Sequence, residues 1–71
     1  MDINLDRFAS QLETQVRGRL VGRVGDLHLL VQENGLILRG HTHTYYAKQL
    51  AQHAVMQETR LPILANEIEV V

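Results

Sequence analysis

Residues 27–43 read LHLLVQENGLILRGHTH, and they contain the clearest structural signal in this 71-residue chain. Asn34-Gly35 separates two apolar runs, and this dipeptide is typical of the type I′ turn of a β-hairpin. A two-residue turn at these positions would set His28 opposite His41. We therefore predict two antiparallel strands, one on each side of Asn34-Gly35.

The two faces of this hairpin differ in character, because successive side chains of a strand alternate between faces. One face is apolar and is expected to form the core side, with Leu27, Leu29, Val31, Leu36 and Leu38. The other, the open face, mixes polar and aliphatic residues: Asp26, His28, Leu30, Gln32, Ile37, Arg39, His41 and His43. Helices are expected to cover only the apolar face.

Helical patterns precede and follow the hairpin. The first has apolar residues three or four positions apart, and we place its end near Gly22: Leu5, Phe8, Leu12, Val16 and Leu20. The second is capped by Thr44 and has a stripe of mostly small residues: Ala47, Leu50, Ala51, Ala54 and Val55. Residues 64–71 alternate as a third strand. The expected fold is an α+β domain in the order α-β-β-α-β, with a three-stranded sheet and both helices on one face.

Composition restricts the class of protein. Leu, Ile, Val and Phe number 23, about 32% of the chain, which is more than disordered chains contain. The chain has no cysteine, so disulfides and thiolate metal sites are excluded. No apolar run is long enough for a transmembrane segment, and the first six residues do not form a signal peptide. We expect one domain over residues 1–71, cytoplasmic by default.

Three segments resemble the BON domain family. Leu36–Gly40 is similar to the family's V-x-L-x-G core, and Tyr45–Ala54 is similar to the helix that follows it. Leu61–Val70 resembles the closing pattern V-x-x-V-x-N-x-I-x-V. The resemblance covers about residues 12–71, although Arg60 stands where the family has glycine.

This resemblance implies an α-β-β-α-β domain without catalytic residues. The family is often found in envelope proteins and is proposed to bind phospholipid, so the resemblance adds a peripheral membrane location and a membrane-associated partner to the expectations. Because one fold can serve many functions, the residues themselves have to support such an activity.

The predicted topology gathers cationic and tyrosine side chains at one end of the molecule, where the first helix ends and the second begins. The candidates for binding an anionic lipid are Arg17, Arg19, Arg23, Tyr45, Tyr46 and Lys48, with His41 and His43 nearby. The acidic residues Asp2, Asp6, Glu33 and Glu58 are expected at the opposite end. Free N–H groups at a helix start suit phosphate, and tyrosine suits a membrane interface. A simpler interpretation is that the arginines only cap the first helix.

The open face supports a second hypothesis, a contact with a protein partner or a neighbouring domain. Its candidate residues are His28, Leu30, Ile37, Arg39, His41 and His43. With Asp26, expected opposite His43, the three histidines could also ligate zinc. A flat sheet seldom brings ligands into a tetrahedron, so no metal is expected.

Two further classes rank lower. Gly22-Arg23-Val24-Gly25 has the GxxG spacing of the KH loop that clamps nucleic-acid backbone, but the chain has a net charge of −1. Ser10 is the single serine, and it lies far from the histidines in the sequence, so no nucleophile and base are paired. We therefore expect neither an enzyme nor a bound cofactor, and nucleic-acid binding is the last alternative.

Overall fold

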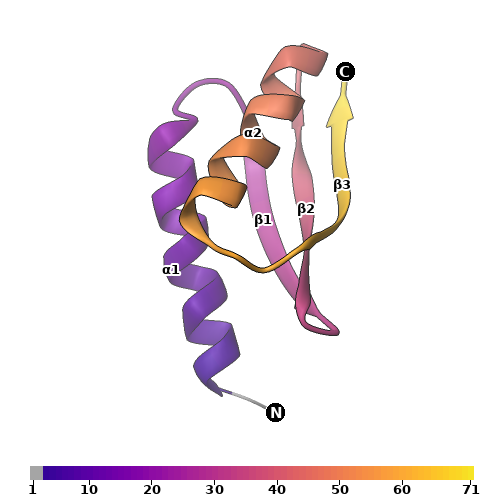
Figure 1. The fold of residues 1–71 in the computed structure, drawn as a ribbon. Helices are drawn as coiled ribbons and strands as arrows, with labels where there is room; N and C mark the ends of the chain where they lie inside the picture. The colour runs from indigo at the N-terminus through magenta and orange to yellow at the C-terminus, as the bar shows by residue number, and fades with distance from the viewer. Residues whose placement is uncertain (1–2) are drawn as a thin grey trace.

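The structure, a computed structural model, describes the backbone of residues 3–71 and the side chains of residues 7–71. Its elements are α1 (Ile3–Arg19), β1 (Gly25–Gln32), β2 (Gly35–Thr42), α2 (Tyr45–Glu58) and β3 (Ile63–Val70). The strands form one sheet in the order β1-β2-β3, in which β1 and β2 are antiparallel and β2 and β3 are parallel. The predicted α+β fold and its order α-β-β-α-β are confirmed (Figure 1).

Both helices pack on the apolar face of the sheet. The core joins residues of all five elements: Leu12, Val16, Leu20, Leu27, Leu29, Leu36, Leu38, Ala51, Ala54, Val55 and Ile68. The small residues of α2 allow this helix to lie close to the sheet, as their spacing indicated. Of the expected first stripe, Phe8 is half-buried against the core, and the side chain of Leu5 lies outside the described residues.

The hairpin turn lies one residue earlier than predicted. Glu33 and Asn34 have positive φ angles of 47° and 68°, as a type I′ turn requires, and Gly35 is the first residue of β2. His28 therefore lies opposite Arg39 and not opposite His41. From His28 to Gln32 the pairing differs from the predicted one by two positions, so the predicted alternation of faces is kept there; the register shifts between Gly25 and His28.

Apolar pairing across the strands explains this register. Leu29 lies opposite Leu38, and Val31 lies opposite Leu36. A turn at Asn34-Gly35 would have set Leu36 opposite Glu33, which would bring a charge beside the core. The structure instead places Glu33 in the turn, where its carboxylate is exposed.

The loop after α1 is held against the end of β2. The helix ends at Arg19, three residues before the predicted end at Gly22, whose φ of 76° belongs to the loop. Thr42 is the one buried polar residue of the described chain, and its hydroxyl donates to the carbonyl oxygen of Arg23 at 2.6 Å. Arg23 is therefore fixed where β2 ends.

The second helix begins as predicted. The Thr44 hydroxyl accepts a hydrogen bond from the amide of Ala47 at 3.0 Å, the geometry of an N-cap. Thr44 follows β2 closely, so the start of α2 also lies where β2 ends. Pro62 lies in the loop between α2 and β3, where the missing amide proton breaks no helical hydrogen bond.

Candidate functional site

Three segments meet at one end of the molecule: the loop after α1, the start of α2 and the end of β3 (Figure 1). Besides the bond between Thr42 and Arg23, the amide of Val71 donates to the Thr42 carbonyl oxygen at 2.8 Å. We call this region the loop end and define it as residues 20–24, 41–46 and 70–71. Three of the residues predicted to bind an anionic lipid lie in it: Arg23, Tyr45 and Tyr46.

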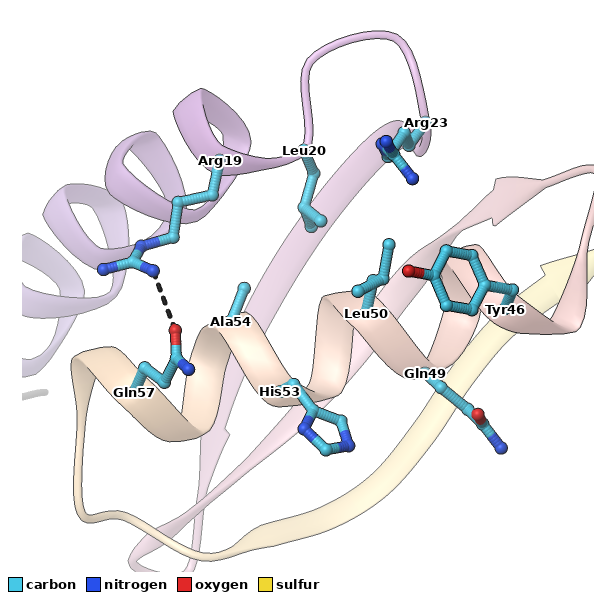
Figure 2. A pocket seen from close by; sticks show the side chains of 9 residues that line it. All are labelled: Arg19, Leu20, Arg23, Tyr46, Gln49, Leu50, His53, Ala54 and Gln57. Atoms are coloured by element: carbon cyan, nitrogen blue, oxygen red, sulfur yellow. Dashed lines mark hydrogen bonds between the residues drawn. The ribbon is translucent and has the colours of Figure 1, made fainter.

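A groove of about 530 Å³ lies between the loop and α2. Its lining is mixed in character: Arg19, Leu20, Arg23, Tyr46, Gln49, Leu50, His53, Ala54 and Gln57. Figure 2 shows Leu20, Leu50 and Ala54 turned toward one another in the middle, with the ring of Tyr46 beside Leu50. The groove therefore has an apolar centre and polar groups at its rim.

Arg19 is held at one end of this groove by α2. Its Nε donates to Glu58 Oε1 at 2.9 Å. Its Nη1 donates to Gln57 Oε1 at 2.8 Å, the bond that is dashed in Figure 2. Glu58 therefore lies beside Arg19. The prediction that Glu58 lies at the opposite end from the arginines is wrong. Of the other acidic residues expected at the far end, Glu33 lies in the hairpin turn, whereas Asp2 and the side chain of Asp6 are outside the described residues.

Arg17 bridges α1 and the edge strand β1 and does not line the groove. Its Nη2 donates to Glu13 Oε1 at 2.9 Å and to the carbonyl oxygen of Leu27 at 2.8 Å. The contact to Leu27 occupies a backbone acceptor at the edge of the sheet, so it also limits strand addition there. Arg17 therefore has a structural role, in which it links α1 to β1. This role differs from the simple capping of the first helix, which was the alternative interpretation of the sequence.

Arg23 differs from these two arginines. Among residues 7–71 its side chain has no ion pair and no hydrogen bond, and it borders the groove. Both tyrosines are exposed, Tyr45 by 72% and Tyr46 by 64%, and Val21 in the neighbouring loop is exposed by 79%. The loop end thus combines a free cation with exposed apolar and aromatic side chains.

Lys48 lies on another side of α2. Its carbonyl oxygen accepts from Asn66 Nδ2 at 3.1 Å, so residue 48 lies toward β3. Lys48 is half-buried, and it does not line the groove. The structure therefore brings together Arg19, Arg23 and Tyr46 from the predicted set, places Tyr45 beside them and separates Arg17 and Lys48.

A second cavity, of about 240 Å³, opens at the loop end beside the groove. It is lined by Gly22, Arg23, Val24, Gly25, His41, Thr42 and His43. His41 lies opposite Gly25, and its Nδ1 is 3.5 Å from Asp26 Oδ2. Asp26 therefore faces His41. The prediction from the sequence that it would face His43 is wrong. Arg23 borders both cavities.

The histidines do not converge on one point. His28 Nδ1 lies 2.9 Å from Glu13 Oε1, so this ring is directed to α1, whereas His41 and His43 line the small cavity. Within the part of the chain that the structure describes, no three His, Asp or Glu side chains form a group that could hold a metal ion.

The open face keeps a small apolar area near the hairpin. Leu30 lies directly opposite Ile37, and both are half-buried. Leu64 is exposed and covers Gly35, where a Cβ would lie 2.5 Å from its Cγ. Farther along the face, Arg39 Nε donates to Glu67 Oε1 at 3.0 Å, so this cation is paired.

Sequence reasoning missed two polar residues that hold elements together. Glu13 accepts from Arg17 and lies beside His28, and its spacing of four residues from Arg17 is a detectable signal in a helix. Asn66 donates to the Lys48 carbonyl oxygen and accepts from the amide of Ile68 at 3.2 Å. Asn66 stands at the asparagine of the closing pattern in the BON resemblance, but its contact with α2 was not predicted, because that contact depends on the position of α2 over β3.

No family model matches the chain, and the comparisons with curated proteins and with solved structures give no match either. In residues 3–71, no helix is both long enough and apolar enough to cross a bilayer.

Proposed function

We propose that this chain is a non-catalytic binding module, similar to BON domains, that binds anionic phospholipid head groups at the loop end. One observation carries the proposal: Arg23, without an ion-pair partner among residues 7–71, borders a groove beside exposed aromatic residues. The element order α-β-β-α-β also agrees with the fold that the resemblance implied.

The physical basis is the combination of charge with apolar exposure. An arginine near an anionic bilayer contributes about 1 kcal/mol to binding, and its guanidinium can bond two phosphate oxygens. Val21, Tyr45 and Tyr46 supply side chains that favour the headgroup region. With one unpaired arginine at this end, the expected binding is weak and reversible.

The apolar centre of the groove supports the same function. Leu50 is half-buried and Leu20 is only 4% exposed, so the groove offers little apolar surface to a complete acyl chain. Arg19 contributes less to the attraction than Arg23, because Glu58 already neutralises its charge. The groove therefore suits a headgroup and the first carbons below it.

Co-sedimentation with vesicles tests this function. At about neutral pH, the chain should bind phosphatidylcholine vesicles that contain phosphatidylglycerol better than vesicles of phosphatidylcholine alone. Arg23→Gln should weaken binding to the anionic vesicles roughly fivefold, the effect of about 1 kcal/mol.

Arg60→Gln is the matched control. It removes the same charge from an exposed arginine in the loop between α2 and β3, away from the loop end (Figure 1). This variant should bind almost as well as the wild type. Equal losses in the two variants, or a wild type that does not distinguish the vesicles, would overturn the proposal.

A protein contact through the open face is the second candidate function. The Leu30–Ile37 pair and the exposed Leu64 favour it, because they form an apolar area that neither helix covers. Backbone amide shifts distinguish the candidates: anionic micelles should shift Arg23 and Tyr46, whereas a protein partner on this face should shift Leu30 and Ile37.

A further inference from the structure

We propose that the small cavity beside Arg23 holds the phosphodiester of an anionic lipid headgroup, and that this binding is coupled to protonation of His41 and His43. The inference rests on the proposed function, and it adds both a position for the phosphate and a dependence on pH. Three groups of the 240 Å³ cavity carry it: one guanidinium and two imidazole rings.

The contacts of the two rings determine what they can offer a ligand. His43 Nδ1 lies 3.3 Å from the main-chain oxygen of Val71, and His41 Nδ1 lies 3.5 Å from Asp26 Oδ2. Both neighbours are oxygen acceptors, so they favour a proton on Nδ1 of each ring. In a neutral ring Nε2 then has a lone pair and cannot donate to a phosphate oxygen. A second proton turns Nε2 into a donor.

The balance of charges around the cavity also favours phosphate binding when the histidines are protonated. Asp26 approaches His41 from β1, and Glu69 is the neighbour of His41 in β3. With neutral histidines, Arg23 is therefore the single cation among these groups, against two carboxylates. Protonation of both rings raises the cations to three. Phosphate binding and protonation then favour each other, because each supplies the opposite charge that the other lacks.

The position of the cavity explains why a lipid headgroup is the chosen ligand. Val21 precedes the cavity residue Gly22, and Val71, which is 67% exposed, contacts His43. Exposed apolar side chains thus flank the cationic opening, as a bilayer surface requires. A soluble phosphate ester would gain nothing from these side chains.

The test measures vesicle binding at two pH values. Phosphatidylglycerol is a suitable probe, because its phosphodiester keeps one negative charge throughout this range. Affinity of the wild type for phosphatidylglycerol vesicles should rise roughly tenfold between about pH 7.5 and about pH 5.5, the range in which histidine changes charge. The double variant His41→Gln, His43→Gln should lose this rise, so that its affinities at the two pH values are nearly equal.

His28→Gln is the matched control, since His28 is an exposed histidine of β1 that lines neither the groove nor the small cavity. It should keep the full rise. Loss of the rise in this variant, or a rise that persists in the double variant, would overturn the assignment to the cavity. Thermal unfolding of each variant verifies that it is folded.

The outcomes separate this inference from the proposed function. If the wild type prefers anionic vesicles but its affinity does not change with pH, the coupling is wrong and the binding function remains. If anionic vesicles are not preferred at either pH, the binding function fails as well. Soluble glycerophosphoglycerol should compete poorly, and strong competition would overturn the dependence on a lipid surface.

Discussion

Glu33 adopts a backbone conformation that most side chains avoid. Its φ is 47°, in the left-handed region, where contact between Cβ and the backbone costs a residue such as glutamate about 1–2 kcal/mol. The hairpin accepts this cost because the resulting register sets Leu29 opposite Leu38 and Val31 opposite Leu36. Asn34, at φ 68°, is a residue type that tolerates the conformation.

Glu33→Asn should therefore stabilise the protein by about 0.5–1 kcal/mol, since asparagine tolerates positive φ and glutamate does not. Urea unfolding measures the change. Glu33→Gln is the control, because it removes the same charge without the preference for this conformation. A gain of equal size in both variants would show that charge and not backbone strain explains the effect.

Residue 40 has to be a glycine because the neighbouring strand leaves no space for a side chain. A Cβ at this residue would lie 2.8 Å from the carbonyl oxygen of Gly25, where the register of β1 and β2 shifts. The backbones approach closely here, and Thr42, two residues later, reaches Arg23. A side chain at residue 40 would therefore disturb the pairing of β1 and β2 next to the Thr42–Arg23 hydrogen bond.

At the level of elements, Asn66 joins α2 to β3. Its amide donates to the Lys48 carbonyl oxygen and to Gln52 Oε1, and its oxygen accepts from the amide of Ile68. These contacts fix α2 over the sheet and also occupy a backbone amide of an edge strand. Arg17 occupies a backbone acceptor of the other edge strand, so each edge is partly blocked against strand addition.

Asn66→Ala should destabilise the protein by about 1–3 kcal/mol, because it leaves half-buried polar groups of two elements without a partner. The free energy of unfolding in urea measures this. Gln52→Ala removes only one of the three contacts and should cost clearly less. Equal costs would mean that packing around α2, and not the bridging amide, determines the effect.

Across the entire chain, the net charge of −1 describes the electrostatics poorly. Glu33 lies in the hairpin turn, at the opposite end of the sheet from Arg23 (Figure 1). Several other cations are paired, among them Arg17, Arg19 and Arg39. The interaction with an anionic surface therefore depends on which end of the molecule faces the surface, and not on the net charge.

The dependence of binding on salt shows whether the net charge of the chain or the local charge of the loop end governs binding to an anionic surface. If binding to phosphatidylglycerol vesicles at about neutral pH depends on the loop end, raising ionic strength from about 0.05 M to about 0.5 M should weaken it several-fold. A molecule that behaved as its net charge would be repelled by the vesicles, and salt would strengthen its binding. Co-sedimentation across this range measures the sign of the effect.

The sequence by itself determined the order of the elements and the faces of the helices and strands. Apolar spacing located both helix stripes, the hairpin dipeptide located its turn to within one residue, and Thr44 located the start of α2. These features follow from local geometry, in which side-chain periodicity and capping depend on residues only a few positions apart. The predicted gathering of Arg23 and Tyr46 at one end also followed from this order.

Only the tertiary structure decided which charged groups are free. Arg17, Arg19 and Arg23 have the same chemistry and lie within seven residues, but the partners that distinguish them come from elsewhere: Leu27 for Arg17, and Glu58 for Arg19. The register of the hairpin likewise depended on which leucines meet across the strands. Pairing between distant residues is set by how the elements pack, and a local pattern contains no record of that packing.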